Sequence, residues 1–459
     1  MRKLALVGLV VASPAFAQDR EPWQPPTLTT TRYDEDWSTM ADPADRPGRW
    51  SDDLKYIPIT DDAYATVAAE IRIRNESYRN NLWGGAAAPD DGYQWVRFVP
   101  SVDLHAGRVR AFVQPIAAYA IGVAPSASPI DQTRVDMLQA FADLRLGDAG
   151  TGSPDGFGVT LRAGRQMISL GTERLVGTRY GPNVPLAFDG VRALASLNGA
   201  TLSLFAVRPV QPGPSSFDDR RSRTKTLWGA YLTRHGLDLY YLGYHNTQAR
   251  FGGVAGDEMR HSVGARWFGS REGWHWNSEG IYQFGRFTNQ TISAWSVGTE
   301  LGHAFQDLPG APDTTLRFNV VSGDRHRGDT QLNTFNALFP KGKYFGELSP
   351  VGPSNIVSLN PRVAVSVTKT VSASLAGMAY WRFSRADGIY DIPGNLIRAP
   401  GTATSRFIGR EVEATLAWQA TPDLELSTSV SLFGPGGFIR QTGPARTIAM
   451  LGLEANFRF

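Results

Sequence analysis

Arginine is the residue type whose number and spacing in this sequence point to chemistry. The 459-residue chain has 46 Lys and Arg residues, and only six of them are Lys. Arginines repeatedly alternate with apolar residues, as in the segment IRIR at 71–74, and the acids Glu70 and Glu76 share that parity. A guanidinium group keeps its charge and binds a carboxylate through two parallel hydrogen bonds. The pattern therefore favours a basic wall that binds anions, as in the Arg or Lys rings of anion-selective pores, over a merely solvated polar face.

The sequence lacks the patterns of the common catalytic centres. The seven His residues form no H-x-x-x-H or H-E-x-x-H motif, and no G-x-S-x-G elbow occurs. The lack of Cys excludes thiol nucleophiles, disulfides and Cys-based metal sites. Glu411 and Glu413 could resemble a glycosidase pair, but alternate positions on one strand more often face a common interior and balance arginines. We therefore predict no enzyme activity, no metal and no cofactor.

The elements that must position the arginines are β-strands. Apolar residues recur with a period of two, not 3.6, in segment after segment. In the C-terminal segment TIAMLGLEANFRF, Leu451 and Leu453 share one face, whereas Glu454, Asn456 and Arg458 share the other. Eighteen segments alternate in this way, at residues 64–78, 93–105, 108–121, 134–146, 157–168, 188–198, 200–210, 224–234, 236–246, 258–268, 273–284, 292–305, 313–323, 356–369, 370–384, 405–419, 423–434 and 445–459.

The connections between these segments predict a closed barrel in a membrane. Connections after even-numbered segments are mostly tight, as at Asn198-Gly199, whereas those after odd-numbered segments are longer, above all residues 324–355. Outer-membrane barrels have short periplasmic turns and long extracellular loops. A soluble β-sandwich would also alternate, but no second sheet is set apart by a linker. The sequence thus predicts an all-β fold, a transmembrane antiparallel β-barrel of about 18 strands over residues 64–459, in the outer membrane of a Gram-negative cell.

In such a barrel the alternating arginines face the lumen, because charges on the lipid face are costly. Acids of the same wall are expected to pair with some of them. These arginines are Arg72, Arg74, Arg97, Arg108, Arg110, Arg162, Arg192, Arg317, Arg362 and Arg382. Tryptophans near strand ends are expected in the interfacial girdles, namely Trp95, Trp267, Trp274, Trp276, Trp381 and Trp418.

The N-terminal residues predict export and a separate acidic segment. Residues 1–17 have a basic start, a short apolar stretch and an A-x-A site, which is typical of a signal peptide. The apolar stretch is too short for a membrane anchor. Residues 18–63 are rich in Pro and carry eleven Asp or Glu against five Lys or Arg, whereas the barrel is basic. This periplasmic segment is either a solvated tail or a segment that tucks into the mouth of the barrel through its aromatic residues.

Four stretches resemble signatures of the alginate export family of outer-membrane barrels. They occur in family order over most of the chain: RYDEDWS at 32–38, LKYIPI at 54–59, GRQMISLGTERLVGTRYGPNVPLAFDGVRA at 164–193 and FNALFPKGKYFGE at 335–347. The resemblance implies an eighteen-stranded barrel through which an acidic polysaccharide leaves the cell past a narrow, strongly basic constriction.

The same resemblance implies a set of constriction residues around the fifth strand and the loop after it. Glu173 and Asp189 would orient the basic residues, although each of these groups could instead form a salt bridge that stiffens a loop. The basic residues are Arg165, Arg174, Arg179 and Arg192. On this expectation, replacing Arg110, Arg165 and Arg192 together by Ala weakens anion selectivity without unfolding the barrel.

The stretch FNALFPKGKYFG at 335–346 contains two of the six Lys residues, Lys341 and Lys343. Pro340 and two Gly residues predict a bent loop rather than a strand. The two lysines either contact lipopolysaccharide phosphates at the cell surface or fold inward with Tyr344 to meet the cargo. The resemblance to the family motif favours the inward alternative.

Three functions are compatible with the sequence. The first is an export channel for an alginate-like polyuronate, within an assembly that includes periplasmic secretion proteins. The second is an anion-selective uptake porin for small anions or acidic oligosaccharides. The third is a barrel enzyme or a structural surface protein. We favour the first, with the anionic cargo, outer-membrane lipids and lipopolysaccharide as partners and without nucleic acid.

Overall fold

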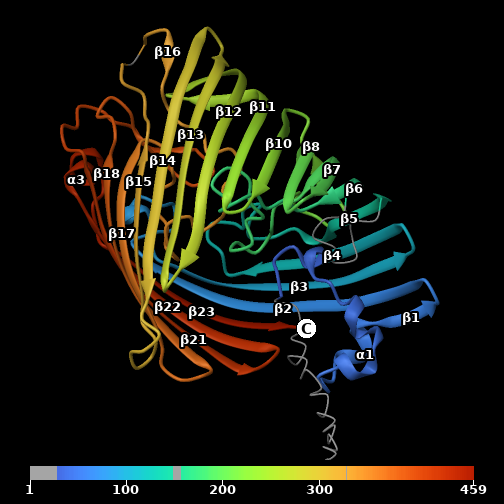
Figure 1. Ribbon diagram of the computed structural model, residues 1–459. Coiled ribbons are helices and arrows are strands. Elements are labelled where there is room, and N and C mark those ends of the chain that lie inside the picture. The colour runs from blue at the N-terminus through green and yellow to red at the C-terminus, as the bar shows by residue number, and fades with distance from the viewer. Residues whose placement is uncertain (1–27, 148–156, 327) are drawn as a thin grey trace, which may run out of the picture.

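The computed structural model describes residues 28–147, 157–326 and 328–459, in which eighteen long strands form one closed antiparallel barrel (Figure 1). Neighbours along the chain pair with one another, and the first long strand, β2, also pairs with the last, β23. The predicted fold class is thereby confirmed. The expected signal peptide at 1–17, with residues 18–27, lies outside the described residues. The barrel strands are β2 (Ala63–Arg79), β3 (Asp91–Ala106), β4 (Val109–Ile121), β5 (Arg134–Gly147), β6 (Gly158–Gln166), β7 (Phe188–Leu197), β8 (Ala200–Gln211), β10 (Lys225–Arg234), β11 (Leu237–Phe251), β12 (Val254–Arg271), β13 (Trp274–Phe287), β14 (Gln290–Ala304), β15 (Asp313–Val321), β17 (Ile356–Ser366), β18 (Val371–Arg382), β21 (Phe407–Thr421), β22 (Leu424–Pro435) and β23 (Ile448–Arg458).

The remaining elements are short. They are the strands β1 (Ile57–Thr60), β9 (Arg220–Arg221), β16 (Gln331–Leu332), β19 (Ile389–Tyr390) and β20 (Leu396–Arg398), the helical turns α1 (Asp52–Lys55), α2 (Asn81–Gly84) and α3 (Gly437–Thr442), and the 3-10 turns η1 (Arg32–Asp34), η2 (Ser38–Ala41) and η3 (Pro43–Asp45). Among the described residues, no helix is both long and apolar enough to cross a membrane. We call the end of the barrel with tight connections such as 198–199 the turn end, and the opposite end the loop end.

The two faces of the wall follow the sequence alternation. On β2, Ile71 and Ile73 are 42% and 40% exposed, whereas Arg72 and Arg74 beside them are 4% and 5% exposed. The apolar side chains therefore face outward and the arginines face the lumen, which loop segments fill. Trp267, with 59% exposure, lies on the outer face, as expected of a girdle residue. The expectation that Trp95 lies in a girdle is wrong. Its side chain is only 5% exposed and shares the inward parity of Arg97 on β3.

Two connections that the sequence placed among the longer loops are tight turns. β11 and β12 pair as far as Phe251↔Val254, and β13 and β14 pair as far as Phe287↔Gln290. Gly252 and Gly253 have φ angles of 56° and 87°, the left-handed values that suit a two-residue hairpin turn. Because these strands remain paired for longer, they rise beyond their neighbours at the loop end (Figure 1).

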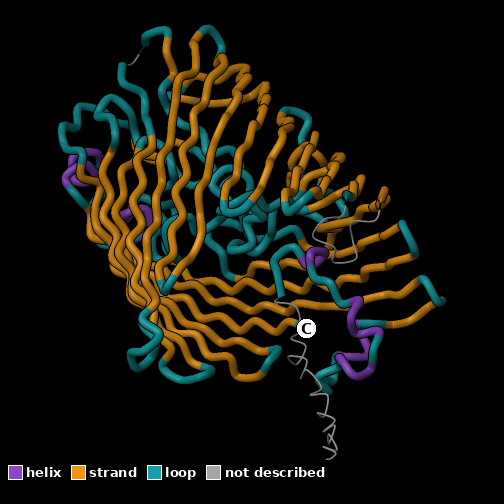
Figure 2. The backbone as a smooth tube through the Cα atoms, in the orientation of Figure 1, coloured by secondary structure: helices purple, strands orange, loops and turns teal. Residues whose placement is uncertain are grey.

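Two loops fold inward and pair with each other inside the barrel (Figure 2). They are residues 167–187, after β6, and residues 333–355, the last part of the connection after β15. Gly177 N donates to Phe339 O at 2.8 Å, Phe339 N donates to Leu175 O at 2.9 Å, and Lys341 N donates to Glu173 O at 2.9 Å. We call residues 173–177 and 339–341 the crossing segments. These hydrogen bonds partner main-chain groups of an irregular backbone inside the lumen, where contact with protein makes such a backbone tolerable.

An apolar core surrounds the crossing segments. The Phe339 ring packs edge-on against Phe188 at 5.3 Å and against Tyr244 at 5.7 Å between centroids. Phe345, further along the same loop, packs against Tyr380 of β18 at 5.4 Å. The loop that contains Lys341 and Lys343 is therefore held inside the lumen by buried aromatic side chains.

The described part of the acidic N-terminal segment packs into the turn end. The Tyr33 ring lies edge-on to Phe112 and Phe141 of the lumen wall, at 5.9 and 5.3 Å between centroids. Its hydroxyl donates to the carbonyl of Met167 at 2.6 Å. Trp50 stacks on the outer residue Phe457 at 6.2 Å. Tyr33 and Trp50 thus attach the described part of the segment to the barrel.

Candidate functional site: a basic lumen

The lumen contains an open cavity of about 650 Å³. It extends from Glu425 and Arg458, near the turn end, to Lys341 and Tyr344 on the inward loop. Seven basic and five acidic side chains line it, so its formal charge is positive. They are Arg72, Arg74, Arg317, Lys341, Lys343, Arg362 and Arg458, with Glu300, Glu347, Glu413, Glu425 and Glu454.

Arg74 of β2 connects three parts of the lumen through its guanidinium group. Its nitrogens contact Glu76 at 2.5 Å, Glu347 of the inward loop at 2.8 Å and Glu454 of β23 at 2.9 Å. Tyr78 and Tyr93 each donate a hydroxyl hydrogen bond to Glu76 at 2.7 Å. Arg74 therefore joins the wall to the loop.

Arg72 and Arg97 hold the loop after β6 against the wall. Arg72 donates to the carbonyls of Tyr180 and Pro182 at 3.1 and 2.8 Å, and Arg97 donates to the same two carbonyls at 3.2 and 3.0 Å. Arg97 also pairs with Glu70 at 2.6 Å, and the Tyr180 hydroxyl donates to the same carboxylate. Arg97 is fully buried, so it positions a loop and does not face the open cavity.

Arg110 and Arg162 lie at the turn end beside the N-terminal segment. Arg110 pairs with Asp103 at 2.6 Å and donates to the main-chain carbonyl of Tyr33 at 2.5 Å. Arg162 pairs with Asp143 at 2.8 Å, and its guanidinium lies 4.2 Å from the centre of the Tyr33 ring. Both arginines thus bind the segment that enters the mouth.

Arg165 and Asp189 form an ion pair of 2.8 Å where β6 ends and β7 begins. Arg165 has the parity of the outward residues Leu161 and Ala163, and it is not among the residues that line the lumen cavity. It also donates to the carbonyls of Met137 and Asp219 at 2.9 and 3.3 Å. The pair therefore joins β6 and β7 to β5 and to the loop after β8.

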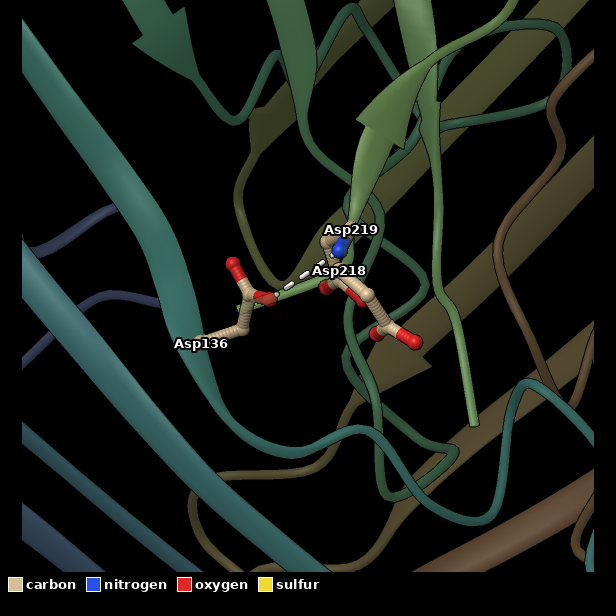
Figure 3. A group of neighbouring side chains, drawn as sticks. All are labelled: Asp136, Asp218 and Asp219. Carbon is tan, nitrogen blue, oxygen red and sulfur yellow. Dashed lines mark hydrogen bonds between the residues drawn. The ribbon is translucent and has the colours of Figure 1, made fainter. Parts of the chain in front are cut away.

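Three carboxylates gather beside this pair. Asp136, Asp218 and Asp219 bring β5 and the loop after β8 together (Figure 3). Asp219 N donates to Asp136 at 3.0 Å, and a nitrogen of Arg165 lies 3.6 Å from Asp136. The amide and the guanidinium offset the negative charge, so the group fits a loop attachment.

The three predicted site residues in the inward loop after β6 have different surroundings. Glu173 accepts hydrogen bonds from Thr178 N at 3.0 Å and from its hydroxyl at 3.1 Å, and so shapes a turn. Arg174 pairs with Glu279 of β13 at 3.1 Å and donates to the Tyr344 hydroxyl at 3.0 Å. Arg179 donates to the carbonyl of Pro340 at 3.3 Å, and burial lowers its pKa to about 10.

The other predicted arginines divide between buried and open positions. Arg382 is fully buried and donates to four main-chain carbonyls of the loops after β18, including that of Ser405 at 2.6 Å. Arg192 donates to the Ser203 hydroxyl at 2.7 Å. Arg317 lines the cavity but pairs with Glu300 at 2.7 Å. Arg362 also lines the cavity, and no described residue forms an ion pair or side-chain hydrogen bond with it.

Lys341 and Lys343 both face the cavity, so the inward alternative describes this loop. Lys343 pairs with Glu347 at 2.5 Å. Within the described ranges Lys341 Nζ has no ion pair or hydrogen bond, and it lies near Arg317 and Arg174. Burial and these two guanidinium groups lower its pKa from the usual lysine value. Lys341 is therefore a cation without an acidic partner among these residues.

Sequence reasoning missed Glu347 and Tyr180 as site residues. Glu347 ends the FNALFPKGKYFGE stretch, and burial alone would raise its pKa, but Lys343 and Arg74 lower it to about 2. Tyr180 lies within the longer stretch, between Arg179 and Gly181. Arg458 was recognised on the polar face of the last segment but was not included, although it lines the cavity. Parity alone could have identified it.

Comparisons with known proteins agree with this architecture. Residues 63–450 match the family model described as alginate export. A search of curated proteins found no significant match.

Solved structures share the fold at low identity. OccK11 (OpdR) of Pseudomonas aeruginosa is 14% identical with a TM-score of 0.54, and the match covers 88% of this chain and 97% of that chain. OccK2 (OpdF) of the same organism, in complex with glucuronate, is 13% identical with a TM-score of 0.56, covering 86% and 98%. OccAB1 of Acinetobacter baumannii is 11% identical with a TM-score of 0.56, covering 89% and 99%. These neighbours are outer-membrane porins.

The family match and the barrel coincide over nearly the whole described chain. The match begins at the first residue of β2 and ends within β23. At their low sequence identity, the structural neighbours show that the barrel fold is shared. The chain therefore belongs to the alginate export family of outer-membrane β-barrel proteins.

Proposed function

We propose that this outer-membrane channel exports an anionic polysaccharide, an alginate-like polyuronate, through its basic lumen. The observation that carries the proposal is the cavity lined by Lys341, Arg362 and Arg458, none of which has an ion-paired carboxylate among the described residues. A cation that is already paired stabilises the wall, whereas a cation facing an open cavity without a partner is free to bind a passing carboxylate. Family membership supports an acidic polysaccharide as the cargo.

Uptake of small acidic sugars is the second candidate. It is favoured by the likeness to OccK2, which binds glucuronate, a single uronate residue. The two candidates share the chemistry of the carboxylate and differ in the length of the solute and in the direction of transport.

We further propose how the molecule is arranged in the cell. Residues 1–17 direct export and are removed. Residues 18–63 form a periplasmic segment, whose described part from residue 28 contacts the turn end. Lipopolysaccharide surrounds the loop end, and periplasmic secretion proteins deliver the polymer to the turn end.

Planar bilayer recordings of the purified full chain test this proposal. A reversal potential that indicates anion selectivity, with conductance blocked by polyuronate added on the turn side, supports export. Anion flux that glucuronate carries but polyuronate does not block supports uptake. A channel without anion selectivity would contradict both. Replacing Lys341 and Arg362 together by Gln should lower the anion-to-cation permeability ratio, whereas Lys369→Gln should not, because Lys369 is exposed in a turn outside the lumen.

A further inference from the structure

The structure already contains a carboxylate bound to a pair of cations at the cavity wall. The Glu347 carboxylate accepts from Lys343 Nζ at 2.5 Å and from Arg74 at 2.8 Å. All three side chains line the cavity. Two charge-assisted hydrogen bonds from different cations are the arrangement that a protein uses to bind a carboxylate ligand.

We propose that Arg74 and Lys343 form a binding site for a sugar carboxylate in the lumen, and that Glu347 is its resident occupant, which the carboxylate of the cargo displaces. This inference rests on the proposed passage of carboxylated sugars through the lumen. It adds a specific site and an exchange between an internal and an external carboxylate.

Of the three acids that pair with Arg74, Glu347 is the one whose side chain can move away from it. Its side chain is 28% exposed, whereas that of Glu76 is 3% exposed and that of Glu454 is 16% exposed. Glu76 is further held by two Tyr hydroxyls, and both Glu76 and Glu454 belong to barrel strands. Glu347 belongs to the inward loop, so only its side chain needs to rotate into the cavity.

The exchange preserves the charge of the cluster. A carboxylate from the cargo brings the same single negative charge that Glu347 removes, so Arg74 and Lys343 are never left without an anion. Breaking a buried pair without replacement is strongly unfavourable, and replacement avoids that cost. The backbone of the loop can remain in place, because Glu347 N donates separately to Glu413 at 2.6 Å.

Glucuronate block of single-channel current tests the inference. Glu347→Gln removes the competing carboxylate, which acts at the high effective concentration of a tethered group, so the half-blocking glucuronate concentration should fall by about tenfold. The matched control is Glu425→Gln, which removes one negative charge from the same cavity but no described ion pair. Glu425→Gln should change the half-blocking concentration by less than about twofold, because a single distant charge is screened.

Further variants separate this inference from its alternatives. Lys343→Gln should raise the half-blocking concentration, and it should cancel the gain in the Glu347→Gln background. Equal shifts in the two Glu variants, or no shift in Glu347→Gln, would overturn the assigned site. If the wild-type channel is anion-selective but Glu347→Gln does not change its block by glucuronate, only this inference is contradicted. A wild-type channel without anion selectivity contradicts the proposed function as well. A difference in gel migration between heated and unheated samples confirms that each variant forms a barrel.

Discussion

At the scale of single residues, partner and position decide what each basic group can do. Arg97 and Arg382 are fully buried and donate hydrogen bonds to carbonyls and carboxylates of the protein. Arg362 and Lys341 face the open cavity without an ion-paired acid among the described residues. On the proposed function, anion selectivity therefore depends on few of the many cations in the lumen, and the others hold its loops in place.

Lys341 should make anion selectivity depend on pH. Its pKa is lowered, chiefly by burial and further by Arg317 and Arg174, while Glu173 and Glu300 act in the opposite direction. Raising the pH therefore removes its charge below the usual lysine range, and the anion-to-cation permeability ratio should fall. In Lys341→Arg the fall should be smaller than in wild type, because a guanidinium group holds its proton more strongly than an ammonium group. A wild-type ratio that is constant up to about pH 10, near the unperturbed lysine pKa, would contradict this assignment.

Arg97→Ala should destabilise the protein more than Arg72→Ala. Both arginines bind the carbonyls of Tyr180 and Pro182, but only Arg97 has an ion pair with the buried Glu70. Removing one partner of a buried pair costs about 3–5 kcal/mol. The free energy of unfolding in urea measures the difference. The double variant Arg97→Ala with Glu70→Ala should recover part of the loss, and no recovery would show that the pair is not the cause.

At the scale of elements, alternation predicted the strands well and the loops poorly. A period of two is a local property, so parity identified the inward Arg74 and placed Arg458 on the polar face of the last segment. The same parity, if applied to Trp95, would have placed it in the lumen. Arg165 was assigned to the constriction by resemblance, although its position beside Leu161 and Ala163 indicates the outward side.

The crossing segments had no signal in the sequence that could reveal their pairing. Gly177 and Phe339 lie far apart along the chain, and each sits in a stretch without regular alternation. Their contact depends on the barrel that brings both loops into one interior. The roles of Arg72, Arg97 and Arg174 could not be predicted for the same reason, because their partners belong to inward loops or distant strands.

Phe339→Ala should loosen the crossing segments and increase conductance. The Phe339 ring is 4% exposed and fills the space between Phe188 and Tyr244, and a buried Phe→Ala change costs about 3–5 kcal/mol. The barrel should persist, since its strands pair independently of this loop. Single-channel conductance should rise relative to wild type. Phe217→Ala is the matched control, because Phe217 is 75% exposed and should leave conductance unchanged; an unchanged conductance in Phe339→Ala would contradict an obstructing role.

At the scale of the whole molecule, the N-terminal segment and the inward loops meet the lumen from opposite ends. Tyr33 packs on the wall at the turn end, and its hydroxyl reaches Met167, the first residue of the loop after β6. The turn-end mouth is therefore in contact with the loop that Arg72 and Arg97 hold.

Tyr33→Ala should release the N-terminal segment without unfolding the barrel. The substitution removes the ring between Phe112 and Phe141, its contact with Arg162 and the hydrogen bond to Met167. Trypsin should then cleave faster at Arg32, which is 5% exposed in the intact protein. Cleavage at Arg49, whose side chain is 28% exposed, provides an internal comparison. Equal cleavage rates at Arg32 in variant and wild type would show that Tyr33 does not anchor the segment.

The pairing of β2 with β23 also has a consequence for biogenesis. Glu70 and Arg458 face each other across this seam, although nearly the whole barrel separates them along the chain. Until β23 is in place, β2 and β22 each have an edge of unpaired amide and carbonyl groups, which lipid cannot satisfy. The same seam brings Glu454 to Arg74, so wall closure and completion of the basic lumen occur together. A chain without its last strand would therefore have two unpaired strand edges and an incomplete basic lumen.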